Sequence, residues 1–283
     1  MPERSTTAQP GMTPAVRPTA GTMFAALYGK LIPHAWRASG STDDAHSLFY
    51  HRSLAMGWLD ESSTVATGGD EDHLAVAPGL WAMNDAGWDH PRGVAEAGLV
   101  SWFQVEASAV AADRPLPVQP FLRCAGDATV RAGTLRLSAV QVLLPVQGLG
   151  TASRPQYAPV PSMLSGGWFA SCDPEAKTHV EVSISSGQDP SISAVAQQFS
   201  DHLDRLEQDV FVCRSFDIAG GGDCPPPPFD DSFWNGPPRH GVVLRGDLTE
   251  WSCDAIGWLA ETIADLAARL DVRSPLLLAA TRR

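Results

Sequence analysis

The succession of patterned segments in residues 165–283 constrains the fold of this chain most. Four segments are typical of strands: "THVEVSIS", "DVFVCRSFDI", "HGVVLRGDL" and "SPLLLAAT". Two others carry apolar residues at helical spacing, one beginning at Asp189-Pro190 and one running from Ile256 to Leu270. The predicted order is β-α-β-loop-β-α-β, a ferredoxin-like arrangement with two helices on one face of an antiparallel sheet.

The first half of the chain is predicted to be mainly antiparallel β-structure after a helical lead-in. The lead-in helices are "MFAALYGKLI" and "DDAHSLFYHRSLAMGWL", the second with Asp43 and Asp44 at its start. The strands are "SWFQVEASA" and "TLRLSAVQVLLPV", with the proline-containing "LAVAPGLWAM" and "LPVQPFLRC" as edge strands. We expect these strands to form a second sheet or to extend the first. A two-sheet, barrel-like α+β domain is the alternative.

Composition shifts divide the chain into four parts. Residues 1–22 contain almost no large apolar side chains and are predicted to be a disordered tail. Residues 23–150 hold the helical lead-in and the antiparallel half, residues 151–164 a Pro-rich connection, and residues 165–283 the ferredoxin-like half. "WFQVEAS" faintly resembles "THVEVSIS", which matches Glu106 with Glu181, but no helix pair is expected after the first copy. A duplication of the two halves is left open.

Charge and cysteine content exclude several classes of function. The 283-residue chain has a net charge of -12 and no cluster of basic residues, so we expect neither nucleic acid nor membrane as a partner. No apolar run has the length of a membrane span, and we expect a cytoplasmic protein. The five cysteines form no C-x-x-C pair and are expected to be free thiols, with a bridge between Cys213 and Cys224 as the alternative.

No segment predicts a cofactor or a metal. The glycines of "AGGGDC" precede four prolines, which exclude the helix N-terminus that a phosphate loop needs. His46 and His51 are five residues apart, about 140° around a helix, and so do not share a face. The acidic run "GGDEDH" from Gly68 to His73 is typical of a solvated turn, with a weak divalent-ion site as the alternative.

One candidate for chemistry is the polar side of "THVEVSIS". Alternate residues of a strand share a face, so His179, Glu181 and Ser183 should lie about 6 to 7 Å apart, within reach of one small substrate. The imidazole and the carboxylate are the candidate acid–base groups. Glu106 is a third candidate from the earlier strand. A solvated strand face is the alternative.

The other candidate is the loop "AGGGDCPPPPFDDSFWNGPPRHG". Its prolines favour a stiff, extended arm, which we expect to act as a lid or as a contact for a partner. The predicted binding residues in the arm are Phe229, Asp230, Asp231, Phe233 and Trp234. The flanking strands add Arg214 and Arg245, together with Asp217 and Asp247.

These features lead to two hypotheses of function. The first is a cofactor-independent binding or accessory protein, chaperone-like or an assembly component, that holds a protein partner with a sheet edge and the tryptophan-bearing loop. The second is a cofactor-free enzyme of specialised metabolism that acts on an apolar small molecule by acid–base chemistry. An enclosed pocket at the candidate residues favours the enzyme, and an open polar face favours the binding protein. A homo-oligomer is left open.

Overall fold

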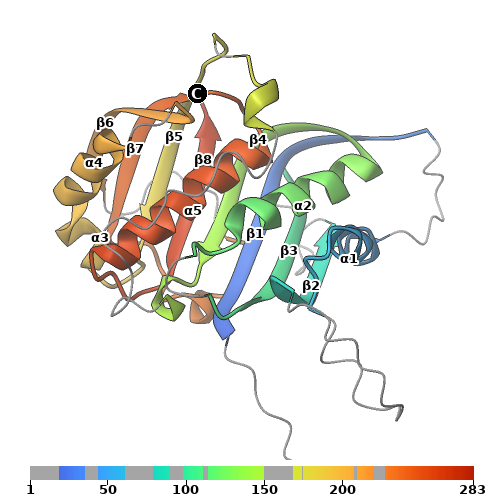
Figure 1. The fold of residues 1–283 in the computed structure, drawn as a ribbon, viewed down its shortest axis with the longest axis horizontal. Coiled ribbons are helices and arrows are strands. Elements are labelled where there is room, and N and C mark those ends of the chain that lie inside the picture. The colour runs from blue at the N-terminus through green and yellow to red at the C-terminus, as the bar shows by residue number, and fades with distance from the viewer. Residues whose placement is uncertain are drawn as a thin grey trace, which may run out of the picture.

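One eight-stranded antiparallel sheet carries the described α-helices on one of its faces (Figure 1). The computed structural model describes residues 19–35, 44–60, 79–88, 98–110, 114–149, 168–173, 175–206, 209–219 and 227–283. The strand order is β2-β3-β1-β4-β8-β5-β7-β6. The predicted mixture of α and β structure is confirmed. The first half extends the sheet of the second half, so the two-sheet, barrel-like alternative is wrong.

The first half contains four strands and two helices. They are β1 (Thr19–Pro33), α1 (Ala45–Ala55), β2 (Trp81–Trp88), β3 (Leu99–Ser108), α2 (Val118–Ala132) and β4 (Gly133–Leu144). A short 3-10 turn, Val146–Gly148, follows β4. Asp44 caps α1 by accepting the N–H of Ser47 at 2.7 Å, as its position at the predicted helix start indicated.

The second half repeats the same order of main elements. They are β5 (Thr178–Ser185), α3 (Ser191–Ala194), α4 (Ala196–Arg205), β6 (Phe211–Ala219), β7 (Gly241–Leu248), α5 (Cys253–Arg269) and β8 (Leu276–Arg282). Two 3-10 turns, Phe169–Ser171 and Asp231–Phe233, lie in the connections. In each half the fourth strand lies beside the first, followed by the third and the second, and β4 pairs with β8 to join the halves.

This repeat corrects the expected relation between the halves. The first half contains two helices, α1 and α2; the sequence patterns predicted α1 but missed α2. The matched glutamates are not equivalent, because Glu106 lies on β3, a third strand, and Glu181 lies on β5, a first strand. The order of strands and helices therefore repeats between the two halves, but the two similar sequence segments lie on strands that are not equivalent.

Two predicted elements of the first half have the wrong type. "MFAALYGKLI" is part of β1 rather than a helix. β1 pairs with β3 and β4 and is covered on both faces, so its apolar run does not alternate and resembles a buried helix. "LPVQPFLRC" enters α2 rather than an edge strand. Pro117 precedes this helix and Pro120 lies in its first turn, where a missing N–H costs little.

The predicted tail is shorter than expected, because its last residues belong to a strand. Thr19–Thr22 belong to β1 rather than to a tail, because they pair with β3. Residues 1–18 and the connection 151–164 lie outside the described residues. The strand predicted as "LAVAPGLWAM" is described from residue 79, and β2 begins at Trp81.

The two halves also meet through α2 and α5, which lie side by side over the sheet (Figure 1). Glycines allow the close approach. A Cβ at Gly126 would lie 2.9 Å from Cys253 Sγ, and one at Gly257 would lie 2.7 Å from the Cα of Gln119. These distances are shorter than a side chain tolerates, so a larger residue at either position would push the helices apart.

A buried carboxyl on α5 caps the start of α2. Glu261 is 6% exposed and accepts the backbone N–H of Gln119 at 2.9 Å. This contact serves a helix whose own N-cap residue makes no side-chain cap. Burial raises the pKa of Glu261 to about 8, and the nearby Asp265 adds to this, although the N–H of Gln119 acts in the opposite direction.

Candidate functional site

The face of the sheet opposite the helices differs between the two halves, and it carries the predicted site residues. On β1, β3, β4 and β8 it holds a small apolar cluster that includes Phe24, Trp102 and Leu277. On β5, β6 and β7 it holds charged side chains. We call the second region the ionic face; its residues are His179, Glu181, Arg214, Asp217, Arg245, Asp247 and Arg283.

The loop after β6 covers the apolar cluster. Trp234 is 2% exposed within that cluster, and the ring of Phe229 packs edge-on against Phe24 with 4.6 Å between centroids. Phe233 is 46% exposed and contacts only the outer part of this packing, the ring of Phe229, with 6.1 Å between centroids. In this conformation the tryptophan contributes to a core instead of presenting its ring to a partner.

The same loop is tied to the turn after β5. The N–H of Gln188 donates to the carbonyl of Asn235 at 2.8 Å, and the N–H groups of Arg239 and His240 both donate to the carbonyl of Gly187 at 3.0 Å. Gly187 has a φ of +69°, and a Cβ there would lie 1.9 Å from the Asn235 oxygen. The turn thus requires glycine in order to hold the loop.

The two predicted acidic loop residues serve the loop itself. The Asp230 carboxylate accepts the N–H of Ser232 at 2.9 Å and caps the 3-10 turn. The backbone carbonyl of Asp231 accepts the N–H of Asn235 at 3.3 Å. Whether these residues or the aromatic ones bind a partner stays a prediction.

Asp247 is the centre of the ionic face. It lies opposite His179 in the pairing of β5 with β7, and its carboxylate is 2% exposed. One oxygen contacts Nδ1 of His179, and the other accepts Nε of Arg214 at 2.6 Å. Burial alone would raise the pKa of Asp247, but hydrogen bonds and charge from Arg214 and His179 outweigh it and lower the pKa.

The contact with Asp247 orients an exposed imidazole. His179 is 72% exposed and uses Nδ1 for the buried carboxylate. Because one ring nitrogen is held in this way, Nε2 is the atom through which the ring can take up or release a proton. This arrangement can support acid–base chemistry as well as a fixed surface contact.

Glu181 joins three strands of the ionic face. Its carboxylate accepts Nη2 of Arg283 at 2.6 Å and Nε of Arg245 at 2.9 Å, and Arg245 also contacts Asp217. Arg283 and Arg245 lower the pKa of Glu181 against its partial burial. The carboxylate is therefore held in its ionised form, which suits an ion-pair partner better than a proton donor.

The third acid–base candidate lies apart from the other two. Glu106 is on β3 and accepts the hydroxyl of Thr22 at 2.9 Å. Four strand spacings, about 19 Å, separate β3 from β5 in the sheet order. The structure brings His179 together with Asp247 and Arg214, and it does not bring Glu106 to them.

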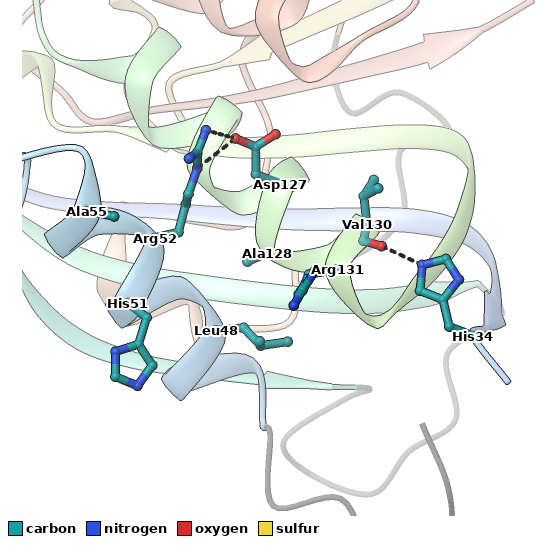
Figure 2. Close-up of a pocket in the computed structure, with 9 residues that line it drawn as sticks. All are labelled: His34, Leu48, His51, Arg52, Ala55, Asp127, Ala128, Val130 and Arg131. Atoms are coloured by element: carbon teal, nitrogen blue, oxygen red, sulfur yellow. Dashed lines mark hydrogen bonds and ion pairs between the residues drawn. The ribbon is translucent and has the colours of Figure 1, made fainter. Parts of the chain in front are cut away.

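A cavity of about 570 Å³ lies on the helical side of the molecule (Figure 2), away from every predicted site residue. It lies between α1 and α2 near the end of β1. Its lining residues are His34, Leu48, His51, Arg52, Ala55, Asp127, Ala128, Val130 and Arg131. Sequence reasoning missed this group because Arg52 and Asp127 are 75 residues apart and no local pattern joins them.

Other predicted features are tested only in part. The described residues contain no group of three or more side chains placed to hold a metal ion. The acidic run Gly68–His73 and Cys224 lie outside the described ranges. Cys213 is a free thiol, and burial raises its pKa. No helix that the structure describes is long and apolar enough to cross a membrane.

Comparison with known proteins gives no guide to function. No family model matches the chain, and no curated protein is significantly similar to it.

Proposed function

We propose that this protein is a cofactor-independent binding protein that holds a protein partner at the β6 side of its sheet. Two features of the described residues support this: an edge strand with exposed apolar side chains, and an adjoining face of exposed arginines. The edge strand is the main support for the proposal. The arginines indicate which face of the sheet beside that edge a partner would contact.

The β6 edge is the main observation. β6 is the last strand of the sheet, and no strand of the described chain pairs with its outer side. Val212 is 43% exposed and Ile218 is 65% exposed along it. Unpaired backbone N–H and C=O groups beside apolar side chains favour the addition of an extended segment from another chain.

The opposite edge is better protected. At β2 the N–H of Asp60 donates to the carbonyl of Trp81 at 2.7 Å, so the segment before the gap already occupies part of that edge. Asn84 and Asp85 are the exposed residues there. Polar side chains and a partial covering are common means of blocking edge association. β6 has neither proline nor lysine in its nine residues, and its one register shift lies between Cys213 and Ser215, away from the exposed Ile218.

The ionic face adds specificity next to the edge. Arg214 is 63% exposed and Arg245 is 46% exposed, yet each is held by a carboxylate of the sheet. An arginine whose position is fixed before binding loses less conformational freedom when a partner arrives, and arginine is enriched among residues that dominate interfaces. Carboxylates or backbone carbonyls of a partner would be the complementary groups.

The test uses the full-length protein from its native host. We expect native mass spectrometry to show a complex with a second polypeptide, or with a second copy of the chain. Ile218→Lys should abolish the complex, because a lysine on the edge blocks strand addition. Val130→Lys is the matched control, since Val130 is 52% exposed on α2 and lies in the helical layer. A partner-free monomer, or a complex that tolerates Ile218→Lys, would overturn the proposal.

A second candidate function rests on the contact between Asp247 and His179. A buried carboxylate that orients an exposed imidazole is an arrangement suited to a general base, and it supports an enzyme acting on an apolar small molecule. The same purification tests this, because a bound metabolite would appear as a fixed added mass that His179→Gln removes. Retention of that mass in His179→Gln would exclude this role for the imidazole.

We also infer that each half is a ferredoxin-like unit and that the protein works in the cytoplasm without nucleic acid. The repeated strand order supports the first inference. The net charge of -12 supports the second.

A further inference from the structure

The cavity between α1 and α2 combines a positively charged rim with an apolar floor (Figure 2). Its volume of about 570 Å³ is within the range of sites for small molecules, roughly 300 to 1,000 Å³. It lies on the helical side of the molecule, remote from the ionic face and from the loop over the apolar cluster. A role for it is therefore separate from the proposed function.

The charges around the cavity are mainly cationic or protonatable. Two guanidinium groups, Arg52 and Arg131, line it together with two imidazoles, while Asp127 is the one carboxylate among the lining residues. The two arginines and the one aspartate leave the lining with a formal charge of +1, whereas the whole chain has a net charge of -12. An electronegative protein would concentrate an anion only where such an excess exists.

The carboxylate in the lining is already matched. Asp127 Oδ2 accepts Nε of Arg52 at 2.8 Å and Nη2 of the same side chain at 2.6 Å. A guanidinium has five N–H donors, and this contact uses one side of it. Arg52 is thereby fixed in place at the rim of the cavity, as Figure 2 shows.

The carbonyl end of α2 would oppose an anion at this position, because the C-terminus of a helix is electronegative. His34 reduces that effect. Its Nε2 lies 3.1 Å from the carbonyl oxygen of Val130, and since a carbonyl can only accept, Nε2 carries the hydrogen. Arg131 in the last turn adds a positive charge at the same end.

The floor and walls between the charges are apolar. Ala128 is 2% exposed and forms the floor, and Leu48, Ala55 and Val130 line the sides. Ala55 on α1 and Ala128 on α2 contribute only methyl groups to the lining, which leaves space that larger residues would fill. A ligand for this cavity needs both a negative group and a hydrocarbon part.

We propose that this cavity binds a small organic anion, a carboxylate with a short apolar chain. The carboxylate lies at the arginine-bearing rim, where guanidinium groups can form charge-assisted hydrogen bonds. The hydrocarbon chain covers Ala128 between α1 and α2.

Isothermal titration calorimetry of the full-length protein with hexanoate at low ionic strength tests the proposal. We expect saturable binding, with hexanol and inorganic phosphate each about tenfold weaker or more, because one lacks the charge and the other the chain. The absence of hexanoate binding would overturn the proposal. Equal affinity for phosphate would also overturn it, since the apolar floor would then play no part.

Two variants locate the binding within the cavity. Arg131→Gln should weaken hexanoate binding by about tenfold, equivalent to one charge-assisted hydrogen bond. Arg273→Gln is the matched control, because Arg273 is a 49% exposed arginine paired with Asp271 outside the cavity. Ala55→Phe at the exposed rim should fill the space and abolish binding while the melting temperature stays unchanged. Unchanged hexanoate affinity in both Arg131→Gln and Ala55→Phe would place the ligand elsewhere and refute the assignment.

Discussion

The two halves of the sheet have the same strand order, but the face opposite the helices serves different purposes in each. In the first half Phe24 and Trp102 stack there with 5.7 Å between ring centroids, beneath Trp234 from the second half. In the second half the corresponding surface holds Asp247 and Glu181 among arginines. The same strand order thus has a buried apolar cluster on this face in the first half and an exposed ionic surface on it in the second half.

The character of a sheet face therefore depends on the segment that covers it and not on the strand order. Phe229 and Trp234, in the described part of the loop after β6, pack against apolar residues of β1 and β3 in the first half. Among the described residues no similar segment covers β5 and β7, where the strands carry charged groups. Four substitutions test this contrast.

The largest expected effect is on the covered half. Trp234→Ala removes a 2% exposed ring from the apolar cluster, so we expect the free energy of unfolding to fall by about 3–5 kcal/mol. Urea denaturation followed by circular dichroism measures this. Phe233→Ala is the adjacent control, and since that ring is 46% exposed the loss should be under about 1 kcal/mol. Equal losses in the two variants would mean that the loop does not form a core.

The next change tests the contact between the two halves on the helical side, where Glu261 of α5 accepts the N–H of Gln119 at the start of α2. Glu261 has a raised pKa of about 8, so the folded state holds a proton that the unfolded state has released between pH 4.5 and 8. The wild type should therefore lose stability as the pH rises through this window, by a few kcal/mol.

Glu261→Gln keeps a carbonyl oxygen for the N–H of Gln119 but cannot titrate. We expect it to become more stable than the wild type above pH 8 and to resemble it near pH 4.5. Denaturant midpoints at a series of pH values compare the two. Parallel curves would show that the buried carboxyl does not control the contact of α2 with α5.

A smaller effect is expected on the ionic face. Asp247→Asn weakens the contacts of a 2% exposed carboxylate with His179 and Arg214, and it should cost about 2 kcal/mol at pH 7. Because the pKa of Asp247 is lowered in the folded state, this stabilisation is present above the unfolded pKa near 3.8 and is lost as the pH falls through the folded pKa. The difference between variant and wild type should therefore shrink in acid. If the difference in stability between variant and wild type stays constant from pH 7 to acid, the cause is packing and not the ionised carboxylate.

The smallest effect should follow from Arg245→Gln. This side chain is 46% exposed, and exposed ion pairs contribute little to stability because water and salt screen them. We expect the denaturation midpoint to stay close to that of the wild type, although partner binding falls. A large loss of stability would mean that the ionic face is a structural core and would weaken its role as a binding surface.

Local patterns predicted most elements of the second half, although the single helix expected after Asp189 is divided at Val195 into α3 and α4. The alternation around Val180 and Val182 and the stripe from Ile256 to Leu270 correspond to β5 and α5. They failed for β1 and α2. A strand covered on both faces has no alternation, and the prolines before and within the first turn of α2 are equally compatible with a strand edge.

For the candidate site, the sequence could predict only which residues of one strand share a face. The spacing of His179 and Glu181 placed both on one face, and the structure places them there. Their partners Asp247 and Arg283 are 68 and 102 positions away in sequence from His179 and Glu181, respectively, and no local pattern indicates such pairs. The cavity with Arg52 and Asp127 was missed for the same reason.

Residue type and short spacing were enough to predict the mixed α and β class of fold and an imidazole beside a carboxylate on one face of β5, and the sequence contains no recognisable cofactor motif. The tertiary structure decided that β1 is a strand, that β4 and β8 join two repeats into one sheet, and that Trp234 is buried. These outcomes depend on which faces are covered by distant segments. Burial by a distant segment is a property of the folded chain that no local window of sequence contains.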